Sequence, residues 1–360
     1  MADVNIHVPG GSYNIHIAPG GLELAGKLVG GLGLTPRALI ITDDNVAPLY
    51  GDKVLESLHR AGVHAELVSV NAGEAAKSLV VAEKLYTKAI QTGIDRRSPI
   101  IALGGGVVGD LAGFVAATFQ RGVPFIQFPT TLLAQVDSSV GGKVAVNHPL
   151  GKNLIGLFYQ PRLVLTDINT LTTLPGRELA SGLAEILKHG LIADPDLFNF
   201  TISQAESLQA CKGGPLSKVI ERSCEIKADV VMRDEREESL RMILNFGHTI
   251  GHAVEAATGF TKYRHGEAVA IGMYGAALLS YRLKLCAAST VEAVNSALGR
   301  LGLPVSAPGC DPEELFAIVS RDKKKIGGSL HWVLIEDIGS VVIRADVPDD
   351  EVRAVLAEIT

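Results

Sequence analysis

The chain has 360 residues, of which 47% are hydrophobic and 20% are charged. These fractions are close to the globular average, which argues against disorder, and the length fits one large or two medium domains. Acidic residues outnumber Lys and Arg by 39 to 33, so the basic charge typical of nucleic-acid-binding proteins is absent. The four cysteines form no C-x-x-C pair, which favours free thiols in a reducing compartment.

Neither a membrane span nor a secretory signal is recognisable. The longest uncharged apolar stretch, 122–136, contains two prolines and is too short to cross a bilayer. The first residues offer neither the basic nor the apolar region of a signal peptide. We therefore expect a cytoplasmic protein.

Alternating polar and apolar residues over 4–8 and 13–17, joined by a Gly-rich turn, predict a β-hairpin. Strand-like runs and helical patterns then alternate along the chain. The predicted strands are 37–42, 64–70, 99–103, 125–128 and 162–166, and the predicted helices between them are 46–61, 78–92 and 111–119. This alternation indicates βαβ units on a mostly parallel sheet.

The periodicity becomes helical after Pro175 and stays so to about Leu301. We expect an α/β domain over residues 1–174 and a mainly α-helical domain over 175–360. Within the latter, 330–336 and 340–345 predict a short hairpin, and a last helix is predicted from Asp349.

A glycine cluster, Gly104-Gly-Gly-Val-Val-Gly-Asp110, follows a predicted strand and opens a predicted helix. Glycines in this position let backbone N–H groups approach a phosphate at a helix N-terminus, although a tight turn would also explain them. Acidic or basic residues after neighbouring strands would suit the rest of a nucleotide. Asp43 or Asp44 stands after one strand, and Glu74 and Lys77 stand after another.

Two histidines, His248 and His252, are spaced to share one helical face, and His265 precedes another apolar helix. Glu185 and Lys188 stand one helical turn apart upstream. Imidazoles and a carboxylate are the usual ligands of a catalytic zinc, whereas core or surface histidines are the alternative interpretation. Such polar groups are costly to bury without partners, which favours the metal.

Several cations stand near glycines and turns. Lys143 and Lys152-Asn153 are predicted in small-residue loops that can close around an anion, and Asp137 stands beside them. Arg241 is predicted one helical turn before Asn245, on the face that carries His248 and His252.

In order, the segments 104–110, 128–132, 137–143, 151–153, 184–188, 245–252 and 265–267 closely resemble the 3-dehydroquinate synthase family. The resemblance runs from about residue 40 to 330. It implies an NAD-binding α/β domain, a helical metal-binding domain and a homodimer. It also implies conversion of 3-deoxy-D-arabino-heptulosonate 7-phosphate to 3-dehydroquinate and phosphate, with NAD regenerated in each turnover and zinc or cobalt as the metal.

The resemblance further implies a role for each matching residue. Glu185, His248 and His265 match the metal ligands, and His252 matches a residue near the leaving phosphate. Phosphate contacts are implied for Lys143 and Asn153. They are also implied for one lysine of 323–325, which we take as Lys324, and for Arg121 of a second subunit. Lys227 and Arg241 match carboxylate contacts, whereas Asp137, Lys188, Glu237 and Asn245 match positions around the substrate hydroxyls and the metal. The positions matched to NAD are Asp44, Glu74, Lys77, Gly105, Gly106, Val107, Asp110, Thr130, Thr131, Lys152, Thr170 and Thr173.

Two other classes of enzyme share these features. Another sugar-phosphate cyclase, such as 2-deoxy-scyllo-inosose synthase, would also use NAD and a metal, but its substrate lacks the carboxylate that Lys227 and Arg241 would bind. A metal-dependent polyol dehydrogenase would release NADH. A non-catalytic binding module would not need metal, phosphate and nicotinamide features together.

Overall fold

The computed structural model describes residues 2–325 and 330–360, and the side chains of 322–325 lie outside the described part. The chain forms two compact units, one of residues 1–174 and 216–235, the other of 175–215 and 236–360. Helix α8 (Gly213–Arg233) therefore belongs mostly to the first unit, which corrects the expectation of an uninterrupted domain over 175–360. Helical periodicity marks a face to be buried but does not say what will cover it.

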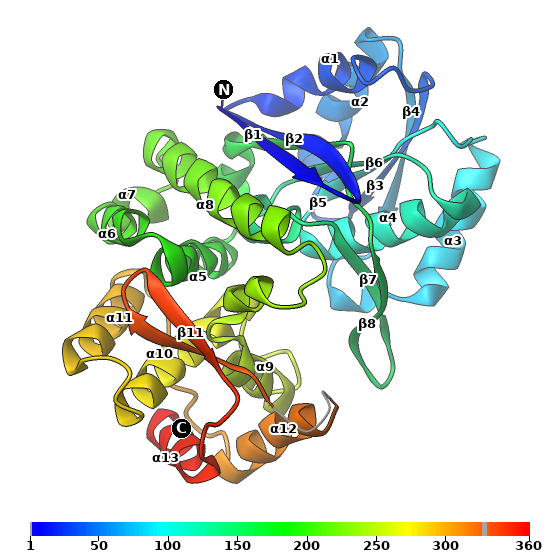
Figure 1. Ribbon diagram of the computed structural model, residues 1–360. Coiled ribbons are helices and arrows are strands. Elements are labelled where there is room, and N and C mark those ends of the chain that lie inside the picture. The colour runs from blue at the N-terminus through cyan, green and yellow to red at the C-terminus, as the bar shows by residue number, and fades with distance from the viewer. Residues whose placement is uncertain (1, 326–329) are drawn as a thin grey trace. The chain divides into compact units, whose positions relative to one another are not determined.

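The first unit is built on a sheet that has seven strands among the described residues (Figure 1). Its order is β1 (Ala2–Val8), β2 (Gly11–Ala18), β9 (Leu163–Asp167), β6 (Phe125–Pro129), β5 (Ile100–Gly104), β3 (Arg37–Asp43) and β4 (His64–Val70). β1 and β2 pair antiparallel, and the other neighbouring strands pair parallel. The predicted hairpin and the mostly parallel sheet are confirmed.

Helices cover both faces of this sheet because side chains alternate along each central strand. On β3, Ile40 packs with residues of α1 (Ala25–Gly30) and α2 (Asp52–Arg60). Leu39 and Ile41 point to the other face and pack with residues of α3 (Leu79–Gln91) and α4 (Gly106–Thr118). Short helical turns join these elements: η1 (Gly21–Leu24), η2 (Ala47–Gly51), η3 (Glu74–Ala76), η4 (Phe119–Arg121), η5 (Ala134–Ser138) and η6 (Ile168–Thr173).

A second hairpin was not predicted. β7 (Lys143–His148) and β8 (Gly151–Phe158) pair antiparallel and form a sheet of their own (Figure 1). The expectation that Lys143 and Lys152-Asn153 lie in loops is therefore wrong, because these residues stand on strands. Their glycines and polar residues hid the pairing, since much of β8 is exposed and shows no alternation of buried residues.

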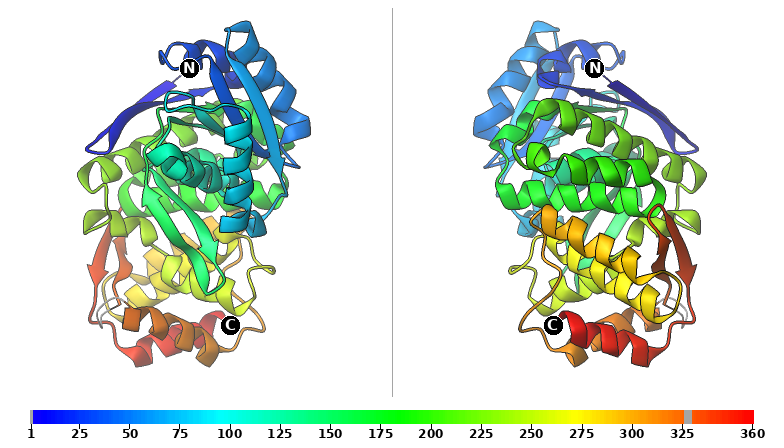
Figure 2. Two further views of the ribbon diagram at one scale, coloured as in Figure 1. Left: turned by 90° about the vertical axis from the view of Figure 1, so that its right-hand side faces the viewer. Right: turned by 90° about the vertical axis from the view of Figure 1, so that its left-hand side faces the viewer.

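The second unit is mainly helical, as predicted. Its helices are α5 (Gly176–Ala193), α6 (Pro195–Ser203), α7 (Ala205–Gln209), α9 (His248–Ala257), α10 (His265–Arg282), α11 (Ala288–Arg300), α12 (Pro312–Lys325) and α13 (Asp349–Ile359), with the turn η7 (Leu240–Asn245). The predicted hairpin is formed by β10 (Trp332–Asp337) and β11 (Ser340–Arg344). Helix α10 packs against α5, α9, α11 and α13 and lies at the centre of this unit, and α12 and α13 lie side by side (Figure 2).

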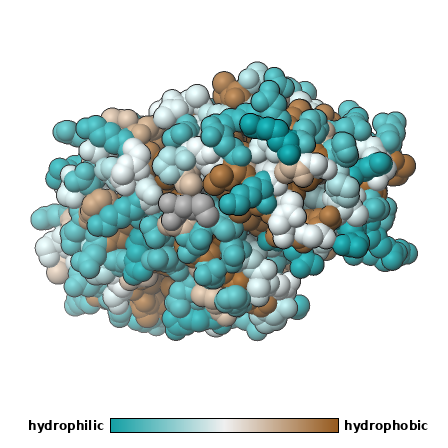
Figure 3. Space-filling view, turned by 90° about the horizontal axis from the view of Figure 1, so that it is seen from above, coloured by the Kyte–Doolittle hydropathy of each residue, from teal (hydrophilic) through white to brown (hydrophobic). Residues whose placement is uncertain are grey.

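Among the described residues, no helix combines the length and the apolar character that crossing a membrane requires. Hydrophilic side chains cover most of the face in Figure 3, with hydrophobic residues scattered among them. In the part of the chain that the structure describes, Cys211, Cys224, Cys286 and Cys310 form no disulfide.

Candidate functional site

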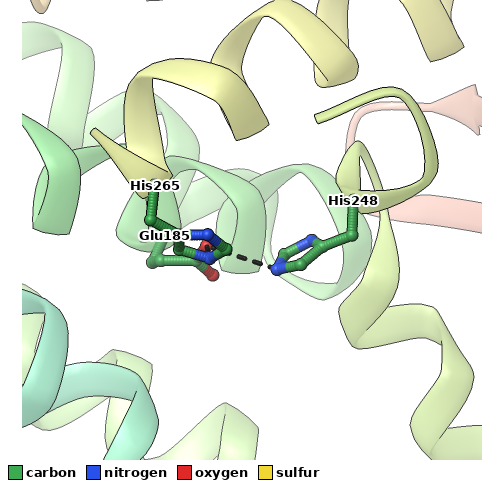
Figure 4. Close-up of side chains that lie close together, drawn as sticks. All are labelled: Glu185, His248 and His265. Carbon is green, nitrogen blue, oxygen red and sulfur yellow. Dashed lines mark ion pairs between the residues drawn. The ribbon is translucent and has the colours of Figure 1, made fainter. Parts of the chain in front are cut away.

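Three side chains of the second unit converge as the ligands of a metal would (Figure 4). The Nε2 atoms of His248 and of His265 each lie 3.7 Å from Oε1 of Glu185. Glu185 is fully buried, and neither of its oxygens accepts a hydrogen bond from the described part of the chain, although Lys188 is in ion-pair contact. One carboxylate and two imidazoles are the donors of a catalytic zinc site with an open position, so these residues fit the expected metal.

Each ligand comes from a different helix. Glu185 and Lys188 stand one turn apart on α5, as predicted, and both are buried. His248 is the first residue of α9, because Gly247 before it adopts a φ of 81° and turns the chain into the helix. His265 is the first residue of α10.

The N-terminus of α10 is held firmly at His265. The Glu267 carboxylate accepts a hydrogen bond from the backbone N–H of Arg264 at 2.8 Å and from Arg177 at 2.8 and 2.6 Å. Burial raises the pKa of Glu267, but these hydrogen bonds and the charges of the two arginines lower it overall. The carboxylate is thus kept ionised and ties α10 to α5 beside the candidate ligand.

Gly266 lets α10 approach α5 closely. Its backbone N–H donates to Ser181 Oγ at 2.8 Å, and a Cβ added to Gly266 would lie 2.2 Å from the Ser181 carbonyl oxygen. Any side chain here would push the first turn of α10, and His265 with it, away from α5.

His252 stands one turn after His248 on α9, with ring centroids 5.3 Å apart, as its spacing predicts. Its ring lies 6.0 Å from that of His265, and the side chain is exposed. His252, Glu255 and His265 form a second group whose atoms are close enough to hold a metal. Sequence reasoning missed Glu255, although its spacing of three residues from His252 places it on the same face.

Arg241 and Asn245 do not continue the helix of the histidines, so the prediction of one shared helical face is wrong. They stand on the turn η7, and Gly247 separates that turn from α9. Arg241 is buried, and the side-chain amide of Asn245 donates to Glu237 Oε1 at 2.8 Å. A glycine with positive φ ends a helical register, which the spacing alone did not take into account.

In the first unit, most of the residues matched to NAD lie at one edge of the seven-stranded sheet, whereas Lys152 stands on β8. Asp44 follows β3, Glu74 and Lys77 follow β4, and the glycine cluster follows β5. Thr130 and Thr131 follow β6. Because the carboxyl ends of parallel strands meet at one edge, these segments are brought together there, where open α/β sheets bind ligands.

The glycine cluster forms the expected entry to α4. Gly105 precedes the helix, and a Cβ on it would lie 3.0 Å from the Thr131 side chain. A Cβ on Gly106 would lie 3.0 Å from Ser138 Oγ. A side chain at either position would crowd the backbone N–H groups that a phosphate would approach. Val107 lies half-buried in the first turn.

Lys77 joins several of the predicted residues. Its buried ammonium lies 2.7 Å from Asp110 Oδ2, 2.5 Å from Asn153 Oδ1 and 3.6 Å from Glu74 Oε1. Burial raises the pKa of Asp110, and the positive charge of Lys77 opposes that effect. The structure thus brings Asn153, expected near phosphate, to residues expected near NAD.

Asn147 completes this network and was missed, since a lone asparagine carries no sequence signal. Its amide donates to Glu74 Oε1 and its oxygen accepts from the backbone N–H of Asn153, both at 2.8 Å.

Thr170 and Thr173 lie on η6, where Thr170 Oγ1 accepts from Gln135 at 3.1 Å and Thr173 Oγ1 lies 2.5 Å from Tyr50 OH.

The remaining cations are spread over both units. Lys227 Nζ lies 2.6 Å from Asp137 Oδ1 in the first unit, whereas Arg241 belongs to the second. Lys143 and Arg121 are exposed, Lys152 is half-buried, and Arg121 has a φ of 68°. Lys324 stands in α12, and its side chain lies outside the described part of the chain.

Models of the N-terminal and C-terminal domains of 3-dehydroquinate synthase match residues 67–181 and 182–325. The 3-dehydroquinate synthase of Desulforamulus reducens is 46% identical over 359 residues, covering 99% of this chain and 100% of the relative.

Two solved structures are also similar. A 2-epi-5-epi-valiolone synthase from Streptomyces hygroscopicus with bound NAD⁺ and Zn²⁺ has a TM-score of 0.90 at 30% identity and covers 98% of both chains. A 2-deoxy-scyllo-inosose synthase with carbaglucose-6-phosphate, NAD⁺ and Co²⁺ has a TM-score of 0.90 at 29% identity and covers both chains fully. With two domain models matched in order and a relative nearly half identical over its whole length, the chain belongs to the 3-dehydroquinate synthase family.

Proposed function

We propose that the protein converts 3-deoxy-D-arabino-heptulosonate 7-phosphate to 3-dehydroquinate and phosphate, with NAD and one divalent cation as cofactors. The observation that carries the proposal is the convergence of Glu185, His248 and His265 in a chain 46% identical to a 3-dehydroquinate synthase. The two structurally similar cyclases described above, which have other names, are only 30% and 29% identical.

Two sets of residues hold the cofactors. Glu185, His248 and His265 bind the cation, and the strand ends around Gly105 and Gly106 bind the dinucleotide. When bound, NAD supplies a hydride acceptor that returns the hydride in the same turnover, and the cation supplies a Lewis acid toward substrate hydroxyl oxygens.

The substrate's charged groups require cations of the protein. Lys143 and Asn153 contact the phosphate, and His252 stabilises it as it leaves. Arg241 offers a planar fork for the carboxylate, with Lys227 as a second cation, because a guanidinium matches carboxylate geometry better than an ammonium. Lys188 and Asn245 orient the hydroxyl groups, and these residues position the substrate and stabilise its charge.

The protein works as a homodimer in which Arg121 serves the phosphate of the neighbouring subunit. Arg121 is exposed on η4, and large apolar side chains on and beside β8, Leu150 and Leu154, are 86% and 62% exposed. Exposed apolar groups of this size are frequent at interfaces. The four cysteines, which form no disulfide among the described residues, fit the reducing cytoplasm. Sedimentation should give the mass of two chains, and a monomer at the working concentration of the enzyme would contradict the homodimer.

The test is one incubation of the purified enzyme with the heptulosonate phosphate, NAD and Zn²⁺. We expect many phosphates released per NAD and no net rise in NADH absorbance. NADH accumulating in proportion to substrate would instead indicate a dehydrogenase. A parallel incubation with glucose 6-phosphate tests the inosose synthase reaction, and phosphate release from this substrate alone would overturn the proposal.

A further inference from the structure

We propose that Glu255 is a positioning residue that orients His265 as a metal ligand by accepting a hydrogen bond from its Nδ1–H. This inference rests on the proposed function only for the identity of the cation site. Glu255 itself does not touch the cation.

The ring of His265 lies between two carboxylates. Its Nε2 is 3.7 Å from Glu185 Oε1, and its Nδ1 is 3.4 Å from Glu255 Oε2. A neutral imidazole carries one proton, so a carboxylate facing Nδ1 keeps the proton there and leaves the Nε2 lone pair for a metal. The geometry thereby selects both the tautomer and the ring orientation that the site needs.

The other imidazole of the site has a different partner. Nδ1 of His248 lies 3.3 Å from the backbone carbonyl oxygen of Phe246, which is uncharged. A carboxylate polarises the imidazole more than a carbonyl does and makes it a stronger donor to the metal. The donor strength of His265 toward the metal therefore depends on the side chain of Glu255, which a substitution can change.

The position of Glu255 disfavours the negative charge of a carboxylate. Its side chain is 10% exposed and stands in the last turn of α9, where the helix dipole disfavours a negative charge. Glu255 stands seven positions after His248, so α9 presents both groups on one face. Helix α9 thus supplies one ligand directly and holds the ligand of α10 through Glu255.

The rival interpretation makes Glu255 a ligand together with His252 and His265, since these three also lie within reach of one ion. Burial separates the two interpretations. Glu185 of the first group is fully buried and its oxygens lack hydrogen bonds from the described residues, whereas His252 of the second group is exposed. The first group therefore gains more from a cation.

The experiment compares Glu255→Gln with Glu292→Gln, an exposed control on α11, in the full-length protein. Gln conserves the size of the side chain and removes its charge. We expect Co²⁺ affinity, measured by competition with a chelator, to fall about 10- to 100-fold in Glu255→Gln. The visible spectrum of bound Co²⁺ should keep its band positions, and the control should match the wild type.

Unchanged Co²⁺ affinity in Glu255→Gln would overturn the proposal. So would loss of Co²⁺ as complete as in Glu185→Gln with a shifted spectrum, because Glu255 would then be a ligand. If Glu255→Gln does not fold, ¹⁵N correlation spectra of the zinc-loaded wild type provide the test. The proposal requires the proton of His265 on Nδ1, and a proton on Nε2 would overturn it. Weakened Co²⁺ binding with a wild type that releases no phosphate would support this inference and refute the proposed reaction.

Discussion

Two histidines of α9 stand one turn apart yet face different surroundings. His248 points at the buried carboxylate of Glu185, whereas His252 is exposed. His248→Ala should therefore lose bound zinc and turnover together. His252→Ala should keep zinc and lose turnover by on the order of 10²- to 10⁴-fold, as expected for a group assisting a leaving phosphate. Zinc content by atomic absorption and phosphate release measure both, and zinc loss in His252→Ala would favour the second group of ligands.

Cys224 is fully buried, and burial raises the pKa of its thiol to about 12. Its Sγ donates to the Gln135 carbonyl at 3.3 Å. Unfolding returns the pKa to its usual value near 9.0, so the unfolded chain loses this proton first as the pH rises. The contribution of Cys224 to stability is present below pH 9 and is lost above it.

The matched variant is Cys224→Ser, which keeps a donor and does not titrate in this range. Between pH 9 and 11 the free energy of unfolding of the wild type should fall faster than that of the variant, by up to about 1.4 kcal/mol per pH unit. Urea titrations at each pH provide the measurement. Parallel curves for the two proteins would contradict the shift.

At the scale of elements, the contact of α10 with α5 depends on one missing side chain. A Cβ on Gly266 would collide with the Ser181 carbonyl, which belongs to a rigid helix. Gly266→Ala should lower the free energy of unfolding by about 1–3 kcal/mol and reduce zinc binding, since His265 moves with it. Denaturant titration and zinc content are the two measurements.

Gly299 in α11 is the control, because a Cβ there meets nothing within 4 Å. Gly299→Ala should raise stability by about 0.5–1 kcal/mol through better helix propensity and leave zinc binding unchanged. If both substitutions were equally tolerated, the close packing of α10 on α5 would not be what positions the ligand.

At the scale of the whole molecule, the two candidate cofactor sets belong to different units. The metal set lies in residues 175–215 and 236–360, and the NAD set lies in the other unit. Removing the metal with a chelator should abolish turnover and lower the melting temperature, while NAD affinity changes by no more than about twofold. Calorimetry with NAD on the metal-free protein tests this, and added Zn²⁺ or Co²⁺ should restore turnover. A tenfold loss of NAD affinity would show that the sets are coupled.

Local patterns in the sequence determined much of this protein. Period-two alternation identified the first hairpin, and apolar runs between helical patterns identified the parallel strands. Spacings within single helices placed Lys188 beside Glu185 and His252 beside His248 correctly, because helical geometry fixes which neighbours meet. The glycine cluster marked the start of α4 for a similar reason, because the conformations that glycine allows affect only the neighbouring backbone.

Other features were decided only by tertiary structure. Helix α8 belongs mostly to the first unit. Strands β7 and β8 pair although polar and apolar residues do not alternate along them. Gly247 ends the helical register that the sequence predicted from Arg241 to the histidines. The contact of Glu255 with His265 and the hydrogen bond of Lys77 to Asn153 join residues from different elements. Such contacts depend on which faces bury one another, and a periodic pattern shows that a face will be buried without showing what will cover it.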